Sequence, residues 1–278
     1  MKQRQMVVFP KAKINLGLRI TGKRSDGYHD IETIFYPVGL CDALEFVASG
    51  QSEGRDILTV TGIDTGVSPS DNIVMKAIRR LRRERSFPWL KIHLHKAIPH
   101  GAGLGGGSSD AACLIKSVNR HFGLSFSDRE LMDIALETGS DCPFFINGEP
   151  ACATGRGELL EPVSRILSGL YMVLVNPGVV ISTMEAYANC TPSAPSGKLS
   201  DLVTRHIAEW RNLITNDFEE FAFRRHEAIK NIKDELYGLG AVFSLMSGSG
   251  STVYGIFTKK PVIDSPILRN LVVWEGIV

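Results

Sequence analysis

Residues 99–112 read Pro-His-Gly-Ala-Gly-Leu-Gly-Gly-Gly-Ser-Ser-Asp-Ala-Ala, with five glycines between positions 101 and 107. An apolar pattern of helical period follows, carried by Leu114, Ile115, Val118 and Phe122. Glycines permit a positive φ and a close approach of the backbone to a ligand. A helix N-terminus offers unpaired N–H groups and the positive end of the helix dipole. The stretch therefore predicts a phosphate-binding loop at the start of a helix.

Two common phosphate loops fit this stretch poorly. The Walker pattern needs a lysine before its hydroxyl residue, but Gly107 precedes Ser108 here. The dinucleotide fingerprint matches the glycine spacing, yet it requires a preceding strand that is buried on both faces. Residues 90–96 instead alternate strictly between apolar and polar side chains, which predicts a strand with one solvent face. A glycine-rich surface turn that binds nothing remains an alternative.

The rest of the chain favours an α+β fold. A strand is expected over Val7–Ile20, a helix begins near Asp71, and the helix after the glycine loop ends at Phe122-Gly123. Ser127 and Glu130 have the spacing of a capping box, which predicts the start of a further helix. We expect two domains, comprising residues 1–157 and 158–278.

Composition and charge narrow the class of protein. The 278 residues are 44% hydrophobic and 22% charged, with a net charge of +1. This balance is typical of a globular protein and predicts no nucleic acid or membrane partner. The five cysteines show no metal-binding spacing and indicate free thiols in a reducing compartment. A cytoplasmic enzyme is therefore expected.

Six separated blocks of the chain match one family in a fixed order. They are Pro10-Lys-Ala-Lys-Ile-Asn15, Asp26-Gly-Tyr-His29, residues 99–112, Gly139-Ser-Asp-Cys-Pro-Phe-Phe145, Asn216-Asp-Phe-Glu219 and Met246-Ser-Gly-Ser-Gly-Ser251. With these blocks the chain resembles the GHMP kinases, a superfamily named after galactokinase, homoserine kinase, mevalonate kinase and phosphomevalonate kinase. The second block distinguishes the branch that phosphorylates a cytidine-diphosphate-linked methylerythritol in the non-mevalonate isoprenoid pathway.

The resemblance implies a two-domain kinase fold with ATP and substrate bound in the cleft between the domains. It also implies transfer of a phosphoryl group from ATP to the 2-hydroxyl of the methylerythritol. Another kinase of the superfamily, with a mevalonate-like or homoserine-like acceptor, is the nearest alternative. A non-catalytic nucleotide- or RNA-binding module is a second one, which the neutral charge disfavours.

Two residues are expected to be catalytic. The resemblance implies that Asp141 orients and deprotonates the acceptor hydroxyl and that Lys13 lies beside it. A nearby ammonium would keep Asp141 ionised, so that it can accept a proton. The alternatives are that Asp141 merely caps a helix and that Lys13 lies on the solvent face of a strand.

The resemblance also implies the nucleotide site. Asn72 and Lys96 are expected near the adenine, and Mg²⁺ is expected as part of the ATP complex. We interpret Asp110 as a helix cap, and the sequence identifies no protein ligand for the metal. The loop residues expected to contact ATP are Pro99, Gly101, Gly103, Leu104, Gly105, Gly106, Gly107, Ser108 and Ser109.

Four residues are expected to hold the acceptor. Asn15 shares a strand face with Lys13, because side chains two apart point the same way, and its amide can bind a polyol hydroxyl. The resemblance implies that Tyr28 stacks on the cytosine and that His29 bonds its edge. It also places Tyr187 as a second stacking aromatic. The oligomeric state is not predicted.

Overall fold

The computed structural model describes residues 5–49, 54–193 and 197–278. These residues form two compact units that are interleaved along the chain. Unit 1 comprises the N-terminal residues up to Ala12 together with Leu40–His100 and Gly105–Gly148. Unit 2 comprises Lys13–Gly39, Gly101–Leu104 and Glu149–Val278. The chain passes from unit 1 to unit 2 for the last time after Gly148, shortly before the expected domain boundary near residue 157.

Unit 1 is built on one sheet with the strand order β1-β4-β6-β5. β1 pairs with β4 and β4 with β6 in antiparallel fashion, whereas β5 pairs with β6 in parallel. Every second residue of β6 is exposed, which confirms the expected solvent face. The strands are β1 (Met6–Val8), β4 (Ala43–Ala48), β5 (Ile57–Gly62) and β6 (Leu90–Lys96).

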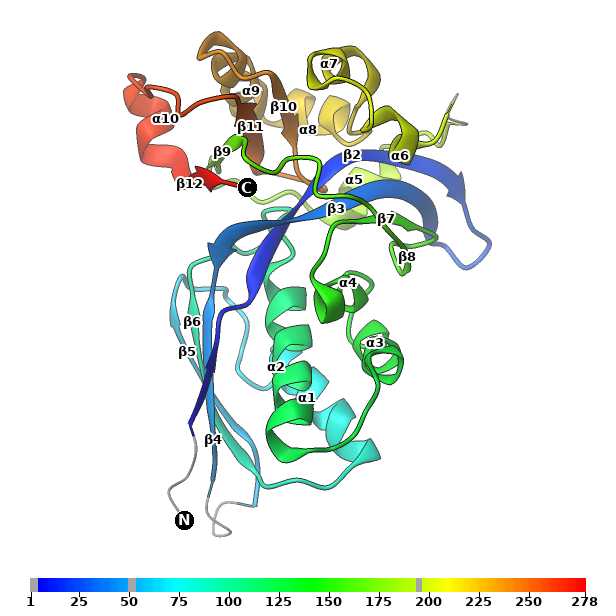
Figure 1. The fold of residues 1–278 in the computed structure, drawn as a ribbon, viewed down its shortest axis with the longest axis vertical. Coiled ribbons are helices and arrows are strands. Elements are labelled where there is room, and N and C mark those ends of the chain that lie inside the picture. The colour runs from blue at the N-terminus through cyan, green and yellow to red at the C-terminus, as the bar shows by residue number, and fades with distance from the viewer. Residues whose placement is uncertain (1–4, 50–53, 194–196) are drawn as a thin grey trace. The chain divides into compact units, whose positions relative to one another are not determined.

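The helices of unit 1 cover the other face of this sheet (Figure 1). α2 ends at Gly123, which has φ +61°, and α3 begins with the capping box of Ser127 and Glu130, so both expectations are confirmed. Apolar residues of the strands and helices form one continuous core. The helices are α1 (Ile73–Glu84), α2 (Gly106–Phe122), α3 (Asp128–Leu136) and α4 (Cys142–Asn147).

Unit 2 contains two sheets, with strand orders β2-β3-β7-β8 and β10-β11-β9-β12. In the second sheet all neighbouring strands are antiparallel. The strands are β2 (Lys11–Lys23), β3 (His29–Cys41), β7 (Ala151–Thr154), β8 (Leu159–Pro162), β9 (Tyr171–Val175), β10 (Phe243–Met246), β11 (Val253–Phe257) and β12 (Val272–Ile277). β2 and β3 belong to unit 2 from Lys13 and up to Gly39.

Short helices surround the second sheet and share its apolar core. The longest of them, α9, contributes Ile229, Ile232 and Leu236 to that core. The helical segments are α5 (Thr183–Ala188), α6 (Leu199–Leu202), η1 (Ile207–Glu209), α7 (Trp210–Leu213), α8 (Glu219–Arg225), α9 (Glu227–Gly238) and α10 (Pro266–Leu271). Together the two units give the α+β architecture that the sequence predicted.

The first expected strand is divided in the structure. β1 ends at Val8 and β2 begins at Lys11, because Pro10 lacks the N–H that would continue the pairing of a strand. β2 is buried on both faces from Ala12 to Leu18. The alternative that placed Lys13 on a solvent face is therefore wrong.

Within the described ranges, none of the helices has both the length and the apolar character needed to span a membrane.

Candidate active site

The glycine loop joins β6 to α2 and has the predicted backbone. Gly101, Gly103 and Gly105 have φ values of +63°, +77° and +68°, which a residue with a Cβ adopts only at a cost. Gly105 occupies the N-cap of α2, and no side chain caps the helix there. The first N–H groups of α2 therefore face the loop without a side-chain acceptor, as binding of a phosphate oxygen requires.

Asp110 does not cap α2, so our interpretation of this residue was wrong. The cap position needs a left-handed backbone, which Gly105 supplies, and Asp110 lies one turn inside the helix. Its side chain is buried, with 1% of the residue exposed. Oδ2 accepts a hydrogen bond of 2.7 Å from Nζ of Lys96.

Lys96 lies at the end of β6 and is only 5% exposed. Its ammonium donates to Asp42 as well as to Asp110. Oδ1 of Asp42 accepts from the backbone N–H of Ala97 at 2.6 Å and of Ile98 at 2.8 Å. The expected adenine contact of Lys96 stays a prediction, whereas its bonds to two carboxylates make it part of the interior of unit 1.

Asn72 and Asp141 begin two other helices of unit 1. Oδ1 of Asn72 caps α1 by accepting from Val74 N–H at 2.9 Å. Asp141 occupies the N-cap of α4, followed by Pro143, but its side chain makes no capping hydrogen bond. Side-chain capping therefore does not account for the carboxylate at position 141.

The loop helix and the block around Asp141 meet inside unit 1. Oγ of Ser108 lies 3.8 Å from the place that a Cβ on Gly139 would take. Burial raises the pKa of the Cys142 thiol to about 12, a shift that a hydrogen bond with Ser108 reduces. Ser109 is buried and its N–H donates to Gly105 O at 2.9 Å. Both predicted serines therefore lie in the first turn of α2.

Lys13 and Asn15 lie side by side on β2, as predicted. The residue Lys13 is 3% exposed, and its Nζ donates to Oδ1 of Asn15 at 2.7 Å and to Gly103 O at 3.2 Å. The amide of Asn15 donates in turn to Oγ1 of Thr33 at 2.8 Å. Unit 2 thus joins the lysine and the asparagine of the first block to a glycine of the phosphate loop.

The turn 246–251 packs against the same glycine. Ser247 donates from Oγ to Gly103 O at 2.8 Å and accepts from Asn15 N–H at 3.2 Å. A Cβ on Gly103 would lie 1.9 Å from Ser247 O, so only glycine fits at this position. Thr33 and Ser247 were missed by the sequence reasoning. The match of the last block to the family could have drawn attention to Ser247.

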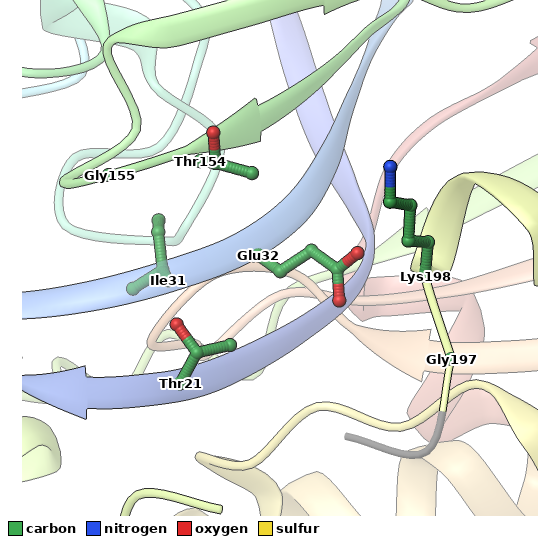
Figure 2. A pocket seen from close by; sticks show the side chains of 7 residues that line it. All are labelled: Thr21, Ile31, Glu32, Thr154, Gly155, Gly197 and Lys198. Carbon is green, nitrogen blue, oxygen red and sulfur yellow. The ribbon is translucent and has the colours of Figure 1, made fainter. Parts of the chain in front are cut away.

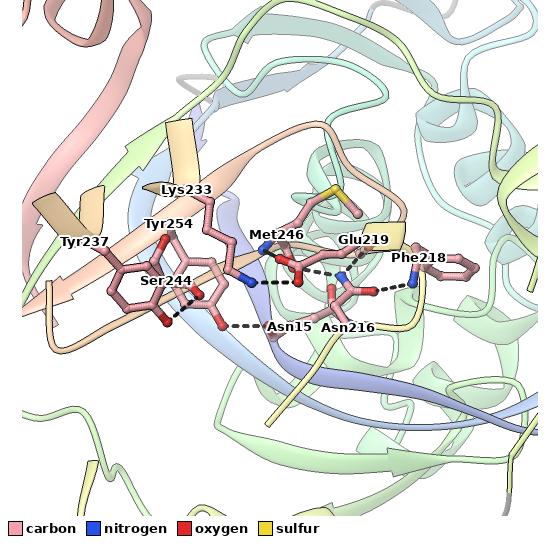
Figure 3. Close-up of polar contacts among 10 residues, drawn as sticks. Asn15, Asn216, Phe218, Glu219, Lys233, Tyr237, Ser244, Met246 and Tyr254 are labelled. Atoms are coloured by element: carbon pink, nitrogen blue, oxygen red, sulfur yellow. Dashed lines mark hydrogen bonds and ion pairs between the residues drawn. The ribbon is translucent and has the colours of Figure 1, made fainter. Parts of the chain in front are cut away.

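A buried polar network supports this turn (Figure 3). Nδ2 of Asn216 donates to Met246 O and Gly248 O, both at 2.8 Å. Glu219 accepts from Met246 N–H at 3.0 Å and from Nζ of Lys233 at 2.6 Å. Burial raises the pKa of Glu219, while Lys233 opposes that shift. The Asn-Asp-Phe-Glu block therefore fixes the backbone on either side of Ser247.

The structure brings two of the three predicted base-binding aromatics together. The rings of His29 and Tyr187 stack with centroids 5.0 Å apart and planes 20° apart. Phe218 meets Tyr187 edge-on at 4.9 Å. Tyr28 is 55% exposed, and its ring lies 4.8 Å from the guanidinium carbon of Arg156.

A pocket of about 440 Å³ lies further along β2 and β3. Thr21 and Ile31 line it from the two strands, and Glu32 and Lys198 contribute charged side chains (Figure 2). None of the predicted site residues lines this pocket. Its remaining lining residues are Thr154, Gly155 and Gly197.

Among the described residues no three or more His, Cys, Asp or Glu side chains are grouped so that they could hold a metal ion. Asp42 and Asp110, which lie beside the two ends of the loop, are bonded to Lys96. Mg²⁺ as part of the nucleotide complex stays a prediction.

Comparison with known proteins identifies the family. A profile described as "GHMP kinases N terminal domain" matches residues 72–149 and one described as "GHMP kinases C terminal" matches residues 199–264. The 4-diphosphocytidyl-2-C-methyl-D-erythritol kinase of Parabacteroides distasonis is 48% identical over 272 residues, covering 98% of this chain and 99% of its own. The kinase of the same name from Porphyromonas gingivalis is 44% identical and covers 98% and 100%.

Solved structures agree with this assignment. A crystal structure of 4-(cytidine 5'-diphospho)-2C-methyl-D-erythritol kinase matches with a TM-score of 0.77 and 29% identity, covering 98% of both chains. The mevalonate kinase of Methanococcus jannaschii matches with a TM-score of 0.64 at 13% identity, which shows a shared fold only. The resemblance found in the sequence is confirmed: the chain belongs to the 4-diphosphocytidyl-2-C-methyl-D-erythritol kinase family of the GHMP kinases.

Proposed function

We propose that this kinase transfers the γ-phosphoryl group of Mg-ATP to the 2-hydroxyl of 4-diphosphocytidyl-2-C-methyl-D-erythritol, in the non-mevalonate isoprenoid pathway. The observation that carries the proposal is the buried Lys13 ammonium, which contacts both Asn15 and Gly103 of the glycine loop. A lysine is costly to bury without a task or a partner. Here it joins the loop proposed to bind ATP to the residue proposed to bind the acceptor.

The chemistry needs positioning and charge stabilisation more than covalent help from the protein. Backbone N–H groups from Gly103 to Ser108 bind the phosphates at the N-terminus of α2, with the hydroxyls of Ser108 and Ser109 as further donors. Asp141 orients the acceptor hydroxyl and takes its proton. Lys13 stabilises the negative charge that develops between donor and acceptor.

The cytidine part of the acceptor distinguishes this proposal from other acceptors. His29 and Tyr187 already stack on one another, and Tyr28 is exposed, so that its ring can stack on a base. Mevalonate-like and homoserine-like acceptors carry no base and would leave these three rings unused. The five free thiols support our placement of the enzyme in the reducing cytoplasm.

The first test is ADP release from Mg-ATP with the cytidylyl substrate, beside mevalonate, homoserine and a sample without acceptor. Turnover with the cytidylyl substrate alone is expected. Turnover with another acceptor would support the kinase activity and contradict the proposed substrate. Nucleotide binding without turnover on any acceptor would favour a binding module.

Asp141→Asn tests the proposed base. We expect kcat to fall by about 10²–10⁴ while ATP binding is retained. Asp133→Asn, on the exposed face of α3 in the same unit, is the matched control and should leave kcat unchanged. An Asp141→Asn variant with normal kcat would remove this residue from the mechanism.

Tyr28→Ala tests the contact with the base. Loss of a stacked ring costs roughly 1–3 kcal/mol per base, so KM for the cytidylyl substrate should rise about fivefold or more while KM for ATP stays constant. Tyr28→Phe keeps the ring and should keep KM. Equal KM values for Tyr28→Ala and the wild type would contradict base stacking at this position.

A further inference from the structure

The cluster of Asp42, Lys96 and Asp110 is the most deeply buried group of charges in unit 1. Lys96 is 5% exposed and both aspartates are 1% exposed. Buried charges are retained only when they are paired and hydrogen-bonded, because taking them out of water is costly. The residues of this cluster come from three segments: the chain before β4, the end of β6 and the first turns of α2.

The cluster contacts the backbone on both sides of the glycine loop. On the entry side, Asp42 accepts hydrogen bonds from the N–H groups of Ala97 and Ile98, directly before Pro99. On the exit side, Lys96 donates to Asp110 in α2. A Cβ on Gly106 would lie 3.3 Å from Nζ of Lys96 and 2.8 Å from Cγ2 of Ile98. The first residue of α2 is therefore packed directly onto the cluster.

Asp42 and Asp110 differ in how many of their carboxylate oxygens accept a hydrogen bond. Both carboxylate oxygens of Asp42 are occupied, one by two backbone N–H groups and the other by Lys96. Oδ1 of Asp110 is buried and has no hydrogen-bond partner among the described residues. Leaving a buried acceptor unsatisfied costs free energy. The presence of this unsatisfied oxygen of Asp110 beside an anion-binding loop therefore needs a reason other than stability.

We propose that Asp42, Lys96 and Asp110 are positioning residues that hold the two ends of the loop 99–105 at the separation needed to bind the nucleotide phosphates. The inference rests on the proposed function, since it concerns how the loop binds ATP. The link between Lys96 and Asp110 is the part that joins the entry of the loop to its exit. Burial and the neighbouring Asp42 raise the pKa of Asp110, while Lys96 opposes that shift.

Asp110→Ala tests that link with little risk to folding, because Asp42 and Lys96 remain as a balanced pair. Affinity for ADP and for adenosine, which lacks phosphates, is measured by titration calorimetry. We expect Asp110→Ala to weaken ADP binding about tenfold, equivalent to about 1.4 kcal/mol, and to leave adenosine binding within about twofold. Asp110→Asn keeps an oxygen acceptor for Lys96 and should restore ADP binding to within about threefold of the wild type.

Asp56→Ala and Asp56→Asn are matched controls from the opposite end of β6. Asp56 pairs with Arg82 at 2.7 Å and accepts from Leu90 N–H at 2.8 Å, and its side chain is 4% exposed, so it is also a bonded acid of unit 1. Its substitution should lower thermal stability without changing the ratio of ADP to adenosine affinity.

Three results would overturn the inference. They are unchanged ADP affinity in Asp110→Ala, equal weakening of ADP and adenosine, and an Asp56→Ala variant that weakens ADP binding as much as Asp110→Ala does. A wild-type protein that binds no ADP would instead contradict the proposed function itself, and the inference with it.

Discussion

The loop 99–105 and the turn 246–251 are both glycine-rich, and each is supported by a lysine that is bonded to a buried acid. Beneath the loop, Lys96 is shared by Asp42 and Asp110. Beneath the turn, Lys233 pairs with Glu219 alone. The first cluster therefore has two carboxyl groups for one ammonium group, whereas the second has one of each.

The two clusters also differ in how they hold the backbone. Glu219 and the amide of Asn216 bond directly to residues 246 and 248 of the turn. In the loop, only the residues before Pro99 are bonded by an acid, and the exit is held through Lys96. Neutral and charged groups alike therefore hold the turn, whereas Lys96 links the entry of the loop to its exit.

Lys96→Met and Lys233→Met should give the largest effects and the clearest contrast. Removing one partner of a buried ion pair costs about 3–5 kcal/mol, because an uncompensated charge stays behind. Lys96→Met leaves the two buried carboxyl groups of Asp42 and Asp110 without their cationic partner and should reach this range. The side chain of Lys233 is 19% exposed, so Lys233→Met should cost less. Urea unfolding measures both, and equal losses would contradict the contrast.

Asn216→Ala should destabilise unit 2 by about 3 kcal/mol. It leaves Met246 O, Gly248 O and Phe218 N–H without their partner, and an unsatisfied buried group costs about 1–3 kcal/mol. The midpoint of urea unfolding reports the loss. Asn189→Ala removes an exposed amide that donates one hydrogen bond to Glu185 O, so it should have little effect on the midpoint of unfolding. A neutral Asn216→Ala would show that the turn does not depend on the amide.

Gly103→Ala should lower kcat/KM for ATP by about tenfold, or about 1.4 kcal/mol. The added Cβ would meet Ser247 O at 1.9 Å, so the loop and the turn must separate. Gly101→Ala has the same sign of φ, but its Cβ meets only Val180 Cγ1 at 3.5 Å. Steady-state kinetics of both variants separates the effect of the close contact with Ser247 from the effect of a strained backbone at positive φ. Equal losses would assign the effect to the backbone conformation rather than to the contact.

Asp110→Asn should change how stability depends on pH. Burial raises the pKa of Asp110 above its ordinary value of about 4. The folded state then holds a proton that the unfolded state releases, so the free energy of unfolding falls as pH rises from about 4 towards the raised pKa. The variant removes this fall, of at most about 1.4 kcal/mol per pH unit for one group.

The measurement is urea unfolding of the wild type and Asp110→Asn at pH 4.5 and 7. Relative to the wild type, the variant should be more stable at the higher pH than at the lower one. Glu219→Gln should show the same trend with a smaller size, because Asp42 adds to the effect of burial at Asp110, whereas burial is the one cause that raises the pKa of Glu219. If Glu219→Gln changed the pH dependence of the free energy of unfolding more than Asp110→Asn does, our comparison of the two clusters would be contradicted.

Much of the fold around the site could be predicted from local patterns. The alternation of residues 90–96, the glycines before α2, Gly123 at its end and the Ser127–Glu130 capping box all appear where they were expected. Each of these signals acts within a few residues, where side-chain spacing and glycine conformation determine the backbone. The contact between Lys13 and Asn15 was predictable for the same reason.

The partners of the predicted residues could not be found in this way. Asp42 and Lys96 are 54 positions apart in the chain, and Ser247 and Gly103 are 144 apart. No local pattern indicates such a pair. The mistaken interpretation of Asp110 has the same origin, because an aspartate near a helix start is as well suited to capping as to a buried ion pair.

The chain's short-range patterns and ordered blocks were thus sufficient to predict an α+β kinase of the GHMP superfamily and the residues proposed to act in it. The tertiary structure decided which charges are buried, that Lys13 lies against Gly103, and that Lys96 is held by two acids. The reason is that local geometry follows from neighbouring residues. The environment of a buried charge depends instead on segments that meet only when the chain has folded.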